Sequence, residues 1–217
     1  MLPRSWLTID AALSQEDLVL LREELSQARL KPALQVHARG DHMRHVRETE
    51  AMAAGLPRLA SAINLLKGVC HEIASAHGTD LTVAAKAQVA CYPGSGTGYK
   101  RHRDNSVDSG TRDVIGFSNW RVFTVILYCN PHYKPEHGGM LRLYPGTTGI
   151  PQPATPWGSR ARVNAHQQPV DVAPVGGRLV AFDSFLEHEV LPSHELRYAI
   201  CVWIWREDMD EEKYSFS

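Results

Sequence analysis

Two nearby residues, His102 and Asp104, and a distant third, His188, form the set of side chains in this sequence that is best suited to chemistry. His102 and Asp104 are two positions apart, so on an extended strand both side chains lie on the same face. A histidine from a distant strand would complete a set of two imidazoles and one carboxylate. That donor set suits ferrous iron and leaves positions open for other ligands. His102, Asp104 and His188 are therefore candidate ligands of an Fe(II) ion, and the choice of His188 depends on the sequence around it.

A His-x-Asp pair alone is weak evidence for a metal site, because such pairs arise by chance and the chain has eleven histidines. The support comes from the flanking sequence. The alternative is a surface His-x-Asp with an unrelated histidine elsewhere. Five segments around and beyond the pair argue against that alternative. In chain order they are Val89–Tyr99 (VACYPGSGTGY), Val125–Asn130 (VILYCN), Gly138–Pro145 (GGMLRLYP), His188–Pro192 (HEVLP) and Arg197–Trp203 (RYAICVW).

In this order the segments resemble the 2-oxoglutarate-dependent prolyl 4-hydroxylases of the oxygen-sensing branch, over residues 80–206. The resemblance implies Fe(II) as cofactor, 2-oxoglutarate and O2 as co-substrates, and ascorbate. It implies oxidation of a proline in an intracellular protein to trans-4-hydroxyproline, with release of succinate and CO2. It also implies a mainly β fold with supporting helices, whose core is a double-stranded β-helix, or jelly roll.

The resemblance also assigns Arg197 to the distal carboxylate of 2-oxoglutarate. A guanidinium suits this role because its planar fork binds a carboxylate through two hydrogen bonds. On an extended strand Arg197 shares one face with Ala199, Cys201 and Trp203, and that face is expected to point into the roll. A buried arginine without a partner is costly, and a bound anion would remove the cost. The alternative is an internal salt bridge to a protein carboxylate.

Further residues are assigned to the co-substrate pocket by the same resemblance. Tyr128 is expected to share the carboxylate with Arg197, and Thr124 lies on the same strand face as Tyr128. Arg121 stands at a position near the substrate peptide, with a surface salt bridge as the alternative. Core packing is the commoner role for any one of the apolar and aromatic residues. The remaining pocket residues are Tyr92, Leu141, Val190 and Trp203.

Composition fits one soluble domain. The chain has 217 residues, of which 43% are hydrophobic and 22% charged, and its net charge is -1. This near-neutral charge argues against a nucleic-acid partner, and no apolar run is long enough to cross a membrane. The four cysteines form no Cys-x-x-Cys pair and are expected to be buried thiols. We expect a monomer in the cytoplasm, or also the nucleus, that takes a proline-containing protein as substrate.

The order of expected elements places helices before strands. Helices are predicted over Ser14–Ala28 and Pro57–His77, and the polar segment Arg39–Glu50 is either a mobile loop or a pair of short strands. One catalytic domain is expected, with a helical support region (1–80), a β core (81–206) and a tail (207–217). The predicted strands are Thr82–Tyr92, Arg121–Asn130, Gly139–Tyr144, Arg178–Asp183 and Arg197–Trp205.

Two long segments, Ser106–Trp120 and Gly146–Pro174, interrupt the predicted strands. Loops at the mouth of such a roll often contact a substrate or partner, and a solvated insertion without a role is the alternative. Two other functions stay open from the sequence. One is a related oxygenase that acts on a free amino acid or an alkylated base, and the other is a metal-binding interaction module without turnover. The complete triad and Arg197 argue against the second of these.

Overall fold

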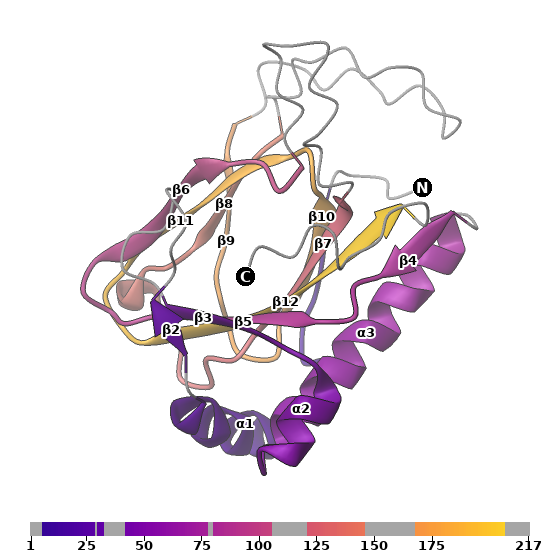
Figure 1. Cartoon of the computed structure of the whole chain (residues 1–217). Helices are drawn as coiled ribbons and strands as arrows, with labels where there is room; N and C mark the ends of the chain where they lie inside the picture. Colours follow the sequence, from indigo (N-terminus) through magenta and orange to yellow (C-terminus); the bar gives the residue numbers. More distant parts are fainter. Residues whose placement is uncertain are drawn as a thin grey trace.

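The computed structural model of the chain describes residues 6–28, 30–32, 42–77, 80–105, 121–145 and 168–206. Two antiparallel β-sheets face each other, and the helices run along the outer side of the larger sheet (Figure 1). This is the mainly β jelly roll with supporting helices that the sequence predicts.

The two predicted helices are confirmed. Helix α1 spans Gln15–Gln27, and the Ser14 hydroxyl caps it by accepting a hydrogen bond from the Asp17 backbone N–H at 3.0 Å. Helix α3 spans Pro57–His77, and a short helix, α2, spans Glu48–Ala53. The larger buried side chains of α1 and α3 recur every three or four residues, so each helix presents one apolar face to the core. These side chains are Leu18, Leu21, Leu25, Leu59, Ile63, Leu66 and Cys70.

Within the described residues, the larger sheet has eight strands and the smaller has four. The larger follows the order β1-β10-β7-β12-β5-β3-β2, with β4 also paired to β12, and the smaller follows β6-β11-β8-β9. The strands of the larger sheet are β1 (Trp6–Ile9), β2 (Lys31–Pro32), β3 (His42–Val46), β4 (Leu81–Val83), β5 (Ala87–Tyr92), β7 (Arg121–Tyr128), β10 (Leu179–Asp183) and β12 (Arg197–Arg206). Those of the smaller are β6 (Thr97–His102), β8 (Leu141–Tyr144), β9 (Val170–Val172) and β11 (Glu187–Ser193).

The central strands β7 and β12 separate two hydrophobic cores. Because side chains alternate along a strand, one face of each packs on the helices and the other faces the smaller sheet. Val125 and Leu127 of β7 lie in the helix-side core, whereas Ile126 and Tyr128 lie in the core between the sheets. On β12, Arg197, Ala199 and Cys201 share the side that faces the smaller sheet. The same alternation therefore builds the core and aims polar side chains inward.

The structure corrects the predicted strand Thr82–Tyr92, which is two strands. β4 pairs with the end of β12 and β5 pairs with its beginning, and residues 84–86 between them leave the ladder. The Ala84 N–H donates instead to the Trp203 carbonyl at 2.9 Å. The apolar alternation continues across this break, so the pattern alone merged the two strands.

Several other expectations are resolved or fall outside the described residues. The segment Arg39–Glu50 contains β3 and the start of α2, so in its described part it is a strand followed by a helix. Strands β1, β6, β9 and β11 were not among the predicted strands. The loop 106–120, most of the segment 146–174 and the tail 207–217 lie outside the described residues. The described end of the second segment forms β9.

Candidate metal centre and co-substrate pocket

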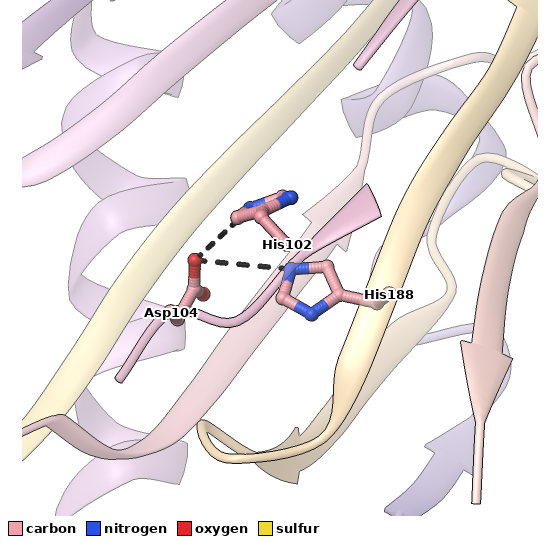
Figure 2. Close-up of side chains that lie close together, drawn as sticks. All are labelled: His102, Asp104 and His188. Atoms are coloured by element: carbon pink, nitrogen blue, oxygen red, sulfur yellow. Dashed lines mark ion pairs between the residues drawn. The ribbon is translucent and has the colours of Figure 1, made fainter. Parts of the chain in front are cut away.

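The three predicted metal ligands lie together. His102 ends β6, His188 lies directly opposite it on β11, and Asp104 follows two residues after β6 ends. One nitrogen or oxygen atom from each residue lies within 4.8 Å of those of the other two (Figure 2). Asp104 Oδ1 is 3.4 Å from His102 Nε2 and 3.7 Å from His188 Nε2. The arrangement leaves three donor atoms facing one point, as a divalent ion requires.

The backbone fixes which nitrogen of each imidazole faces that point. His102 Nδ1 lies 2.8 Å from the Lys100 carbonyl, and His188 Nδ1 lies 2.9 Å from the Leu186 carbonyl. A carbonyl only accepts, so these contacts favour the tautomer in which Nδ1 carries the proton and Nε2 is the nitrogen that can bind a metal. Burial lowers the pKa of His188 to about 4, with the His102 ring acting in the same direction, so His188 is neutral at physiological pH. His188 can therefore bind a metal without first losing a proton.

The Asp104 carboxylate is held from its other side. Its Oδ2 accepts hydrogen bonds from the Thr124 hydroxyl at 2.6 Å and from the Trp203 indole N–H at 3.0 Å. Burial alone would raise the pKa of Asp104, but the neighbouring His188, His102 and Arg121 outweigh it and keep that pKa well below its usual range. Asp104 is therefore ionised and contributes the one negative charge of the donor set.

Asn105, which sequence reasoning missed, anchors the chain immediately after Asp104. Its backbone N–H donates to the Ser184 carbonyl at 2.9 Å, and its side-chain amide donates to the Arg121 carbonyl at 2.7 Å. The residue is buried. These bonds tie the end of β6 to β7 and to the turn after β10. An asparagine directly after His-x-Asp was the available signal, but its partners are far away in sequence.

Arg197, at the start of β12, is buried and has no carboxylate partner within the described part of the chain. Its side chain is 4% exposed, and its Nε donates to the Gly139 carbonyl at 2.9 Å. The guanidinium carbon lies 4.8 Å from the Tyr92 ring centre and 5.1 Å from that of Tyr128. The internal salt bridge weighed from the sequence is therefore not found among the described residues. A buried cation in this state is stabilised by an anionic ligand.

Tyr128 places an unsatisfied hydroxyl beside Arg197. Its hydroxyl is buried and makes no hydrogen bond to any described residue. Burial raises the pKa of Tyr128 to about 12, although the Arg197 charge opposes the rise, so the hydroxyl keeps its proton at neutral pH. A buried hydroxyl beside a buried guanidinium suits the binding of one carboxylate.

The remaining predicted pocket residues surround these groups in different ways. Leu141 is buried in the core between the sheets, and Val190, opposite it on β11, is half-buried. Tyr92 is buried beside Arg197, as noted above. The Arg121 guanidinium stacks on the Trp203 ring at 3.8 Å. Thr124 and Trp203, predicted as pocket residues, direct their polar hydrogens to Asp104, so the structure brings them to the metal site.

Comparison with known proteins gives the family. The sequence model described as "2OG-Fe(II) oxygenase superfamily" matches residues 87–205, more than half of the chain. The chain belongs to this superfamily. Members of the 2OG-Fe(II) oxygenase superfamily use Fe(II) and 2-oxoglutarate. The His102–Asp104–His188 donor set fits the metal, and the buried Arg197 with the neighbouring Tyr128 hydroxyl fits the co-substrate.

Curated relatives are prolyl hydroxylases. The chain is 33% identical over 185 residues to the human prolyl hydroxylase EGLN3, covering 83% of this chain and 64% of that protein. It is 30% identical over 168 residues to the hypoxia-inducible factor prolyl hydroxylase of Caenorhabditis elegans, covering 76% of this chain and 19% of that protein. The chain thus spans less than two thirds of the length of these relatives.

Solved structures share the fold. A prolyl hydroxylase from Trichoplax adhaerens, in complex with a peptide of the hypoxia-inducible factor oxygen degradation domain, superimposes with a TM-score of 0.72 at 24% identity, covering 99% of this chain and 89% of that one. A Pseudomonas putida prolyl-4-hydroxylase gives a TM-score of 0.62 at 24% identity, covering 94% of both chains. Among the described residues, no helix has the length and apolar character needed to span a membrane.

Proposed function

We propose that this protein is a prolyl 4-hydroxylase that converts a proline of a protein substrate to trans-4-hydroxyproline. In the same turnover 2-oxoglutarate and O2 are consumed and succinate and CO2 are released. The observation that carries the proposal is the 33% identity to a prolyl hydroxylase in a chain whose three donor atoms and buried Arg197 are all in place. Ascorbate is the expected reductant that keeps the iron ferrous.

The residues divide into those that hold the metal and those that hold the co-substrate. We assign Fe(II) to His102, Asp104 and His188, and the distal carboxylate of 2-oxoglutarate to Arg197 and Tyr128. When bound, the iron supplies activation of O2 coupled to oxidative decarboxylation of the co-substrate. Tyr92, Leu141 and Val190 are assigned to the pocket walls, which exclude water, and Arg121 to the side that meets the substrate.

Charge balance supports this assignment of both groups to one cavity. Asp104 and the two carboxylates of 2-oxoglutarate carry three negative charges. Fe(II) and Arg197 together carry three positive charges. Buried charges are tolerated when they are compensated nearby, so the cavity is best satisfied when metal and co-substrate are bound together.

The substrate is proposed from the relatives. One relative's structure contains a peptide of the hypoxia-inducible factor oxygen degradation domain. For this chain we propose a proline in an exposed, extended segment of a protein, bound by a monomeric enzyme without nucleic acid. Location in the cytoplasm, or also the nucleus, stays a prediction from the sequence.

The test is turnover with defined components. The protein is incubated with Fe(II), 2-oxoglutarate, ascorbate and air, together with a library of proline-containing peptides, and peptides are analysed by mass spectrometry. We expect one proline-containing peptide to gain the mass of one oxygen atom, with succinate formed in equal amount and neither product formed by His102→Ala. Succinate at background with every peptide would refute the proposal, and oxidation of a free amino acid or alkylated base would replace the proposed substrate.

A further inference from the structure

The hydroxyls of Thr124 and Ser184 form a buried chain that ends on Asp104. We infer that these two residues are positioning residues that hold Asp104 as a ligand through one oxygen. The inference rests on the proposed role of Asp104 as an Fe(II) ligand. It concerns residues that do not themselves contact the metal, and it makes its own prediction about metal binding.

The two hydrogen bonds run in one direction, from Ser184 to Thr124 and from Thr124 to Asp104. Thr124 Oγ1 lies 2.6 Å from Asp104 Oδ2 and 2.9 Å from Ser184 Oγ, and the two hydroxyl residues are 1% and 0% exposed. An ionised carboxylate only accepts hydrogen bonds, so the single Thr124 proton goes to Asp104. Ser184 must then donate its own proton to Thr124. The hydroxyl of Ser184 thereby prevents Thr124 from turning its proton away from Asp104.

Two donors hold one oxygen of Asp104, and the other oxygen faces the two imidazoles. Oδ2 of Asp104 accepts from Thr124 and also from the Trp203 indole at 3.0 Å, whereas Oδ1 faces the Nε2 atoms of His102 and His188. A carboxylate that used both oxygens on the ion would have to give up these bonds. Holding Oδ2 therefore favours binding through Oδ1 alone and keeps coordination positions open for co-substrate and O2.

The donors and the histidines come from opposite sheets. Thr124 lies on β7, directly opposite Trp203 of β12, and Ser184 follows β10, which is the other neighbour of β7. The Ser184 N–H donates to the Val122 carbonyl at 3.0 Å, which fixes it to β7. His102 and His188 belong to the smaller sheet. The Asp104 carboxylate thus joins a rigid group of donors on one sheet to the imidazoles of the other.

The experiment measures metal binding without turnover. Co(II) is titrated anaerobically into the wild-type protein and into Thr124→Val, Thr124→Ser and Ser184→Ala, and the visible absorption spectrum reports coordination. Thr124→Val removes the hydroxyl at nearly constant shape, and Thr124→Ser retains it. We expect Thr124→Val to weaken Co(II) affinity about 10- to 100-fold, the range typical for residues that orient a ligand, and to change the spectrum. Ser184→Ala should act in the same direction with a smaller effect, and Thr124→Ser should restore wild-type binding.

The outcomes separate this inference from the proposed function. If the wild type binds one Co(II) and His102→Ala does not, the metal site is established independently of the hydroxyls. Wild-type affinity and spectrum in Thr124→Val would then overturn the inference, as would a loss in Thr124→Ser equal to that in Thr124→Val. If the wild type binds no Co(II), the proposed metal site is refuted, and with it both the proposed function and this inference. Thermal unfolding of each metal-free variant confirms that it is folded before titration.

Discussion

Replacing Arg197 by methionine should weaken co-substrate binding without destabilising the metal-free protein. In most proteins a buried arginine that is truncated leaves a partner charge uncompensated. Here no described carboxylate pairs with Arg197, and its one hydrogen bond is to the Gly139 carbonyl. Methionine replaces the apolar stem of the side chain and removes the charge.

Arg197→Met should keep or raise the free energy of unfolding of the metal-free protein, but it should lower the affinity for 2-oxoglutarate. Loss of the bond to the Gly139 carbonyl costs about 1 kcal/mol, whereas an uncompensated buried ion costs several kcal/mol, so the free energy of unfolding of the metal-free variant should stay constant or rise. With 2-oxoglutarate, two charge-assisted hydrogen bonds are lost at about 1.5–3 kcal/mol each. The affinity for 2-oxoglutarate should therefore fall about 10²- to 10⁴-fold.

Thermal unfolding measures both effects. The melting temperature is recorded for the wild type and Arg197→Met, with Mn(II) in place of Fe(II) to prevent turnover, across a series of 2-oxoglutarate concentrations. Arg142→Met is the matched control, because Arg142 is paired with Asp171 on the outer side of β8. The reasoning is refuted if Arg197→Met melts far below the wild type without ligand, or if 2-oxoglutarate still stabilises it as it stabilises the wild type.

Three further predictions follow from the site. Gly139→Ala places a Cβ 2.8 Å from Arg197 Cδ at φ +66°, whereas Gly96→Ala meets nothing within 4 Å at φ +78°. In both variants the free energy of unfolding, measured with urea, should fall by about 1–2 kcal/mol, but only Gly139→Ala should lose 2-oxoglutarate binding. Equal affinity of the two variants for 2-oxoglutarate would contradict this prediction. The metal-free protein should lose stability as pH falls from 6.5 towards about 4, because His188 has its lower pKa in the folded state and the unfolded state binds more protons there. Urea unfolding between pH 6.5 and about 4 measures this loss. If the free energy of unfolding depends on pH in His188→Gln as it does in the wild type, the prediction is wrong. His102→Ala should abolish 2-oxoglutarate turnover and bind Fe(II) at least about 10-fold more weakly; equal metal affinity by anaerobic dialysis would exclude His102 as a ligand.

Part of the grouping of the three proposed metal ligands was predictable from the sequence because it follows a local rule. A spacing of two on an extended segment brings His102 and Asp104 to one side, and the structure places them so that their donor atoms converge with that of His188. The third ligand came from the resemblance, since nothing local connects residue 188 to residue 102. The two long helices were found because their apolar positions repeat with the helical period.

The bonds around Asp104 were not predictable in the same way. The hydroxyl chain of Thr124 and Ser184 depends on β7 lying between β10 and β12, and strand order is a property of the whole fold. Asn105 similarly gains its role from backbone atoms of residues 121 and 184. The break at residues 84–86 was missed because apolar alternation does not report where a strand leaves its ladder.

The central claim is that His102, Asp104 and His188 bind one metal ion and that Arg197 binds the distal carboxylate of one dicarboxylic acid. A crystal structure grown anaerobically with Mn(II) and 2-oxoglutarate tests it directly. We predict one ion bound by His102 Nε2, His188 Nε2 and Asp104 Oδ1, and the distal carboxylate of the co-substrate on the guanidinium of Arg197. An ion bound at other residues, or Arg197 paired with a carboxylate of the protein, would contradict the account.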